Sequence, residues 1–286
     1  LQVRGAGKRV VIFNLTLMLP TVVFNGAYWG QCDVIYTSLC LTALYMALQK
    51  KSARSMILFG MALSFKLQTV FFLPALLPLW LRKDIKLRHL ALIPAAYMAM
   101  MIPAFWGGKS LHHALTVYTA QASTYNFMTV NGPSLYNFLP ASMDRGTLYT
   151  MFSGMAMALG MAMLAIVCLM ICLHREHITR EGTLLTCLLV LGGVPFFLPK
   201  MHERYTFGAD VLALAIAAYN PKRVWLPLLF GLSSYICYTA GLPGDAIFDL
   251  KWATVFQGAA VALTAAALYR SLNEEKAEAA LAEVKA

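Results

Sequence analysis

The 286-residue chain is poor in charged residues, which make up 13% of it, while 59% of its residues are apolar. Soluble domains carry about 25% charged residues, so this composition excludes an ordinary soluble globular protein. Acidic residues are especially scarce, 13 against 23 Lys and Arg, and the formal net charge is +10. The six cysteines contain no Cys-x-x-Cys pair and lie mostly in apolar runs. They predict buried free thiols and no zinc or redox motif.

Long apolar runs are abundant in the chain. Stretches of about 17 to 25 apolar residues cross a bilayer as helices, which satisfy their backbone hydrogen bonds internally. We therefore predict an all-α, polytopic membrane helical bundle. The ten predicted segments, several of them short, are 9–24, 34–49, 55–66, 67–82, 89–106, 148–173, 183–198, 206–219, 224–240 and 252–270.

The segment 55–82 decides the predicted topology, because its 28 residues are long for one helix and short for two. With two crossings, 17 of the 23 Lys and Arg residues fall on one side of the membrane. With one crossing, 11 fall on each side and Lys66 lies inside the membrane. Cytoplasmic loops are enriched in Lys and Arg, so we expect two crossings and both termini in the cytoplasm. The positive net charge then reflects topology and requires no nucleic-acid partner.

The domain organisation follows from these segments. We predict one transmembrane domain over 1–272, with an external loop of about 107–147, and a short cytoplasmic tail at 273–286. The tail is rich in Ala, Glu and Lys and is expected to be a soluble helix or a frayed end. Residue 1 is Leu, and the basic stretch at 4–9 reads as a loop between helices. We therefore expect further sequence upstream.

Ionisable side chains gather at the predicted external face. Directly after an apolar run come Lys200, His202, Glu203, Arg204 and Tyr205. Lys66 and Gln68 form a turn on the same side. Charges at the membrane edge are costly unless they are paired or hydrated, and three cations around a cleft suit a lipid-linked phosphate. The alternatives are that Lys66 snorkels to the surface and that Glu203 and Arg204 form a plain ion pair.

Aromatic and amide side chains on this face predict a sugar site. Trp29 stands beside Gln31 and Asp33, and the stretch 131–138, which begins with Asn131, again places aromatic rings next to amides. A flat ring stacks on a sugar face while amides and carboxylates bind its hydroxyls, and Asp33 would accept a hydrogen bond or act as a base. The alternatives are an interfacial aromatic belt and a surface loop resting on the bilayer. No His or Asp spacing typical of a metal site is present, so none is predicted.

Taken in order, four motifs resemble the landmarks of membrane glycosyltransferases of the GT-C superfamily, most of all bacterial proteins related to the second mannosyltransferase of glycosylphosphatidylinositol assembly. The resemblance spans most of the chain, although each motif is short. The glucosyltransferases of asparagine-linked glycan assembly are similar, with His-Glu-Lys in place of His-Glu-Arg. The motifs are Tyr28-Trp29-Gly30-Gln31 with Asp33, Phe65-Lys66-Leu67-Gln68 followed by Pro74, the stretch 131–138, and His202-Glu203-Arg204-Tyr205.

The resemblance implies a hexosyltransferase of the bacterial plasma membrane. Its donor would be a polyprenyl-phosphate hexose, with mannose favoured over glucose, and its acceptor a hydroxyl of a glycan, lipid or protein on the external face. The anomeric carbon would be inverted without a cofactor or divalent metal. The donor phosphate would be held by Lys66, Lys200, His202, Glu203 and Arg204. The sugar and acceptor site would contain Trp29, Gln31, Gln68, Asn131 and Tyr205.

The catalytic base is the point at which this chain departs from the family pattern. By resemblance, the acidic catalytic residue belongs to an earlier external loop, upstream of anything present here. Either that base lies upstream, which we favour, or Asp33 replaces it.

Two other functions remain open. A transporter or flippase of lipid-linked saccharides would also have many helices and an outward cleft. It would place polar groups near the bilayer midplane, often in broken helices of repeated halves, but the sequence shows no internal repeat. A purely structural membrane subunit is the third alternative, and several ionisable groups on one face argue against it.

Overall fold

The computed structural model describes residues 5–122, 125–242 and 247–285, and the chain in these ranges is almost entirely helical. Two short strands, β1 (Thr129–Val130) and β2 (Met201–His202), pair in parallel. The α-helices are α1 (Ala6–Leu17), α2 (Pro20–Val22), α3 (Asp33–Leu48), α4 (Ser52–Phe65), α5 (Leu76–Leu81), α6 (Leu92–Met100), α7 (Ile102–Trp106), α8 (Leu111–Ala122), α9 (Arg145–Leu173), α10 (Arg180–Phe197), α11 (Phe207–Tyr219), α12 (Trp225–Gly241) and α13 (Leu250–Lys285).

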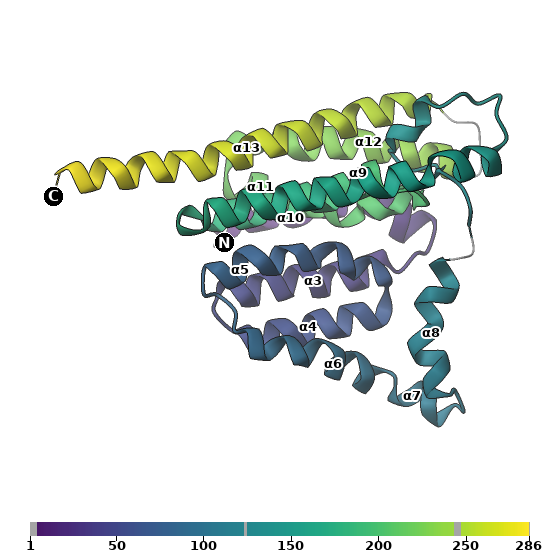
Figure 1. The fold of residues 1–286 in the computed structure, drawn as a ribbon, viewed down its shortest axis with the longest axis horizontal. Helices are drawn as coiled ribbons and strands as arrows, with labels where there is room; N and C mark the ends of the chain where they lie inside the picture. The colour runs from purple at the N-terminus through teal and green to yellow at the C-terminus, as the bar shows by residue number, and fades with distance from the viewer. Residues whose placement is uncertain (1–4, 123–124, 243–246, 286) are drawn as a thin grey trace.

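The long helices lie side by side in layers (Figure 1). Helix α13 packs on α12 and α10, and α10 in turn contacts α9, α11 and the 3-10 helix Leu67–Ala75. Helix α3 packs on α4, and α4 packs on α6. Both chain ends point toward one end of the bundle, while α8 and the segment 125–145 lie at the other. We call this second end the loop end.

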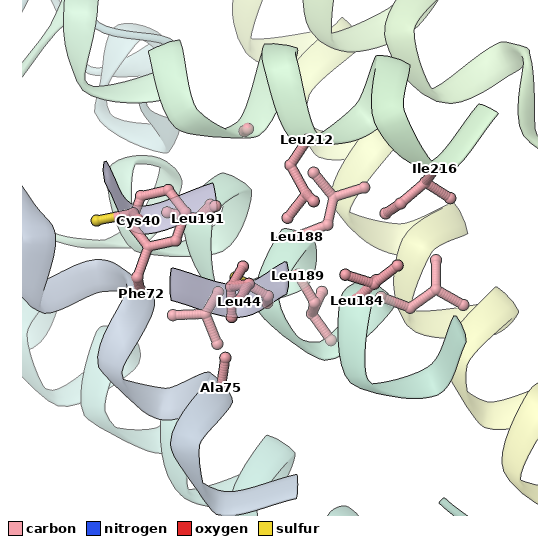
Figure 2. Close-up of a cluster of buried hydrophobic side chains, with 14 of the residues drawn as sticks. Cys40, Leu44, Phe72, Ala75, Leu184, Leu188, Leu189, Leu191, Leu212 and Ile216 are labelled. Carbon is pink, nitrogen blue, oxygen red and sulfur yellow. The ribbon is translucent and has the colours of Figure 1, made fainter. Parts of the chain in front are cut away.

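Helix α10 is the centre of the hydrophobic core. Every residue from Gly182 to Phe196 is buried. Figure 2 shows leucines of this helix meeting side chains of α3, of α11 and of the 3-10 helix Leu67–Ala75. The labelled residues are Cys40, Leu44, Phe72, Ala75, Leu184, Leu188, Leu189, Leu191, Leu212 and Ile216. A helix that is apolar on all sides is stable only when neighbours or lipid cover it, and here neighbours do.

Helix α9 shows the opposite pattern. It is 29 residues long and strongly apolar, yet only five of its residues are buried. Large apolar side chains cover its open face: Met151, Met155, Met157, Leu159, Met161, Ile166, Leu169 and Leu173. Soluble proteins rarely expose such a continuous apolar surface, so this face indicates contact with lipid.

By length and composition, five helical spans of the described residues can cross a membrane, or six if the bent pair Ala6–Leu17 and Pro20–Tyr28 is counted as one span. Each of the ten predicted segments is largely helical, but several, such as Asp33–Leu48 and Ser52–Phe65, are too short to meet this criterion. Length and composition of the described helices therefore support five or six spans.

The division of 55–82 follows the prediction. Helix α4 ends at Phe65, Lys66 is extended with φ −157° and ψ 135°, and the next helical segment begins at Leu67. The region 107–147 is not a simple loop, since it contains α8 and the beginning of α9. Helix α13 continues without a break across residue 273, in keeping with the helical alternative for the tail. Sequence rich in Ala, Glu and Lys forms helix without being long and apolar.

Candidate functional site

Four segments, far apart in the sequence, meet at the loop end. The π-helix Val23–Tyr28 leads into Trp29, Asp33 begins α3, Lys66 separates α4 from the following 3-10 helix, and His202 ends β2. The 3-10 helix Glu203–Thr206 follows at once. We call Asp33, Lys66, His202, Glu203 and Arg204 the charged cluster.

Asp33 and Lys66 form a close ion pair within the cluster. The Lys66 Nζ lies 2.5 Å from Asp33 Oδ1, and the side chain of Asp33 is fully buried while that of Lys66 is 14% exposed. Asn25 Nδ2 donates to the other carboxylate oxygen, Oδ2, over 2.9 Å. The positive end of the α3 dipole also stabilises the negative charge of Asp33. Asp33 is thus engaged through both oxygens, and Lys66 is neutralised rather than free at the surface.

Arg204 is the cation with unused hydrogen-bonding capacity. Its guanidinium carbon lies 5.2 Å from the centre of the Trp29 ring, in a cation–π arrangement. Its Nε is buried and makes no hydrogen bond to any described residue. A buried donor without an acceptor is costly, and such costs are retained where a ligand supplies the acceptor. Arg204 is therefore placed to bind an anion beside the Trp29 ring.

His202 is held between the loop and the cluster. It pairs with Val130 in the short sheet and bridges to Asn131. Its ring lies 5.3 Å from that of Tyr125 and 5.1 Å from that of Tyr205, centre to centre. Burial, with a further contribution from Arg204 and Lys66, lowers the pKa of His202 to about 4. The imidazole is therefore neutral at pH 7, with one nitrogen able to donate a hydrogen bond and the other able to accept one.

Glu203 is buried beside His202. Its Oε2 lies 4.0 Å from His202 Nδ1, and its Oε1 has no hydrogen-bond partner among the described residues. Burial raises the pKa of Glu203, although Arg204 and Lys66 oppose the effect. The plain ion pair with Arg204, one of the two sequence alternatives, is not among the ion pairs of the described residues.

The other predicted site residues divide into two groups. Gln68 lies beside the Tyr205 hydroxyl, and Gln31, half-buried, donates its backbone N–H to Asn25 over 2.8 Å. Lys200 instead contacts the loop: its Nζ lies 3.2 Å from Asn126 Oδ1 and 5.0 Å from the ring centre of Tyr149. Gln68 thus joins the cluster through Tyr205, and Gln31 lies next to Asn25, which contacts Asp33. Lys200 is directed toward the beginning of α9.

Asn131 links the charged cluster to a cavity of about 570 Å³. The cavity lies between the segment 127–148 and the beginning of α13, and aromatic rings, amides and charged side chains line it. Its polar and aromatic lining residues are Phe127, Thr129, Asn131, Tyr136, Asn137, Phe138, Arg145, Phe248, Asp249 and Lys251.

Sequence reasoning missed a buried polar group beneath the cluster. Tyr238 of α12 accepts hydrogen bonds at its hydroxyl from Asn25 over 3.1 Å and from Thr21 over 3.3 Å. Asp210 of α11 lies close by and is 1% exposed. The available signal was the charge of Asp210 within an otherwise apolar run. Within the described ranges, no three His, Cys, Asp or Glu side chains are grouped to hold a metal ion.

Comparisons of the chain with protein-family models, with curated proteins and with solved structures gave no match. The assignment to a family therefore depends on the sequence motifs, and the assignment of a function on the chemistry of the site.

Proposed function

We propose that this chain is a membrane glycosyltransferase of the GT-C type. It transfers a hexose, mannose in preference to glucose, from a polyprenyl-phosphate donor to an acceptor hydroxyl at the loop end. The observation that carries the proposal is Arg204, stacked on Trp29 with a buried Nε that makes no hydrogen bond to the described residues.

The charge of the cluster matches the donor. Asp33 and Lys66 neutralise each other, and Glu203, whose pKa is raised by burial, forms no ion pair with Arg204 among the described residues. Arg204 is the cation of the cluster that no carboxylate of these residues pairs with. A polyprenyl-phosphate hexose is a phosphodiester with one negative charge, so it is matched by one cation. Arg204 and neutral His202 supply hydrogen bonds to its oxygens.

The sugar would lie between Trp29 and the amides of Gln31 and Gln68. The acceptor would enter from the cavity beyond Asn131, whose mixture of rings and amides suits a saccharide. A base near the acceptor oxygen is still required for transfer. Asp33 is fully buried and held by Lys66 and Asn25, so its contacts favour a role in positioning Lys66 over a role as the base.

The proposed topology has ten crossings, both termini in the cytoplasm and the loop end facing outward, as in a bacterial plasma membrane. Placement of 17 of the 23 basic residues on one side supports it. The test is labelling of single cysteines in intact cells with a membrane-impermeant maleimide, after the native cysteines are replaced. Cysteine at Tyr125 should react from outside, and cysteine at Lys222 only after permeabilisation. The reverse labelling pattern would place the loop end, and the candidate site with it, on the cytoplasmic side.

The functional test is hexose transfer from synthetic polyprenyl-phosphate mannose and glucose to a mixture of glycan and lipid acceptors, with the chain purified in detergent. We expect transfer of mannose, with loss of transfer in Arg204→Ala and retention in Lys222→Ala, a cation at the other end of the bundle. Equal transfer by both variants would contradict a donor site at Arg204.

A transporter or flippase of lipid-linked saccharides is the second candidate, and one observation favours it. The first span is bent by 55° between Ala6–Leu17 and Pro20–Tyr28, and a buried carboxylate, that of Asp210, lies close to this span. Broken helices beside buried charge are typical of transporters. Movement of a fluorescent lipid-linked saccharide across liposomes containing the chain, without hexose transfer, would favour this candidate.

A further inference from the structure

Asp210 is a buried acid that forms no ion pair with the described residues. It lies in the first turn of α11 and is 1% exposed. Neither carboxylate oxygen makes a hydrogen bond to any described residue, and Asp210 is absent from the ion pairs of the described ranges. An acid inside a membrane bundle is costly unless a proton, a cation or a hydrogen-bond donor neutralises it, and such residues are functional candidates.

Two hydroxyl groups lie beside this carboxylate, and a third lies next to one of them. Thr21 of α2 and Ser234 of α12 lie beside Asp210, and the Ser234 Oγ is 2.9 Å from Thr206 Oγ1. Thr21 and Ser234 are 1% and 0% exposed, and Thr206 is 0% exposed. These oxygens come from three elements that are distant in the sequence, so the fold itself assembles the group.

The hydroxyl groups beside Asp210 also have other partners. Thr21 donates to the Tyr238 hydroxyl over 3.3 Å, Thr206 donates to the Glu203 carbonyl over 3.4 Å, and either hydroxyl can be the donor in the bond between Thr206 and Ser234. The oxygens of Thr21 and Ser234 thus lie beside a carboxylate that makes no hydrogen bond to the described residues. Hard cations take oxygen ligands, among them carboxylates.

The first span is interrupted at this place. The bend of 55° lies between α1 and α2, Pro20 begins α2, and Thr21 follows it. The chain then continues as a π-helix, a rare form that occurs frequently at functional sites. In many secondary transporters, the unwound carbonyls and helix ends of interrupted helices coordinate sodium ions or protons.

We propose that Asp210, with the hydroxyl oxygens of Thr21, Thr206 and Ser234, holds a buried sodium ion. One carboxylate balances one monovalent charge, whereas a divalent ion is usually bound by more carboxylates. The ion would tie the bent first span to α11, to α12 and to the end of the 3-10 helix Glu203–Thr206. This inference does not depend on the proposed transferase activity.

The test is thermal unfolding of the full chain in detergent, in NaCl, KCl and N-methylglucamine chloride at equal ionic strength. We expect sodium to raise Tm saturably, by about 5 °C at a hundredfold excess over its Kd, with little response to potassium. Asp210→Asn should abolish the response. Asp84→Asn should keep it, because Asp84 is a buried acid paired with Arg82 elsewhere in the fold.

A second measurement covers the case in which Asp210→Asn does not fold. Equilibrium dialysis with radioactive sodium should show one bound ion per chain, displaced by unlabelled sodium. Ser234→Ala and Thr206→Val should each weaken its binding at least tenfold. A Tm independent of sodium, or binding that survives these substitutions unchanged, would overturn the proposal and leave a proton as the neutralising partner of Asp210.

Discussion

The ion pair between Asp33 and Lys66 allows a quantitative prediction, because its two members differ in exposure. Asp33 is fully buried, and Lys66 is 14% exposed on the side-chain scale. Removal of one partner from a buried pair costs about 3–5 kcal/mol, since it leaves a charge in low dielectric. The cost depends on whether the remaining charge can reach water.

Lys66→Met should be the more destabilising substitution. It leaves Asp33 with the Asn25 amide and the α3 dipole, which recover roughly 1 kcal/mol, so we expect a net loss of about 3 kcal/mol. In Asp33→Asn, the flexible Lys66 can extend to water, and we expect a loss of about 1–2 kcal/mol. The double variant removes both charges and should lie within about 1 kcal/mol of the more stable single variant.

The assay is thermal unfolding in detergent at pH 7, by intrinsic fluorescence, for the parent and the three variants. A loss of 3 kcal/mol corresponds to a fall in Tm of about 6–12 °C. The double-mutant cycle should yield a coupling energy of at least about 1.5 kcal/mol. Additive effects of the two substitutions would refute a stabilising interaction between Asp33 and Lys66, because residues that do not interact show no coupling energy.

Two further predictions concern packing and pH. Gly192→Ala should destabilise the fold by about 1–3 kcal/mol, because its new Cβ would lie 2.6 Å from the Phe230 ring, whereas Gly154→Ala has open space and should be neutral or stabilising in the same unfolding assay. The pKa of His202 is about 4 in the folded chain and about 6.5 in the unfolded chain. Between these pH values the unfolded chain binds more protons, so Tm should fall as the pH falls from about 6.5 to about 4. The free energy of unfolding should fall by about 3 kcal/mol at most, and the raised pKa of Glu203 offsets part of this loss. The substitution His202→Gln should flatten the pH profile of Tm.

Much of the architecture could be predicted from local sequence. Apolar runs located the helical segments, and the basic residues indicated a break at Lys66, where the structure does end α4. The bend in the first span was missed, since 9–24 is mostly apolar and Pro20 is its one helix-breaking residue. Helix α8 was missed for a related reason: it is a helix without a long apolar run.

The candidate site was only partly predictable. The His-Glu-Arg-Tyr motif lies at the junction where ionisable groups were expected, because charge at a membrane edge is visible in sequence. The contact partners of these groups could not be predicted. Lys66 pairs with a residue 33 positions away, and Tyr238 is hydrogen-bonded to Asn25, 213 positions away. Such contacts depend on how helices pack, which composition and spacing do not encode. The direction of Lys200 toward Asn126 has the same origin.

The central claim is that Arg204 and His202 hold a lipid-linked sugar phosphate. The most direct measurement is the affinity of the purified chain for a fluorescent, short-chain polyprenyl-phosphate mannose. We expect saturable binding that falls roughly 10- to 100-fold in Arg204→Ala and His202→Ala, since a hydrogen bond to a charged group contributes about 1.5–3 kcal/mol. Lys222→Ala should bind as the parent does. Unchanged affinity in both site variants, with their folding intact, would contradict the account.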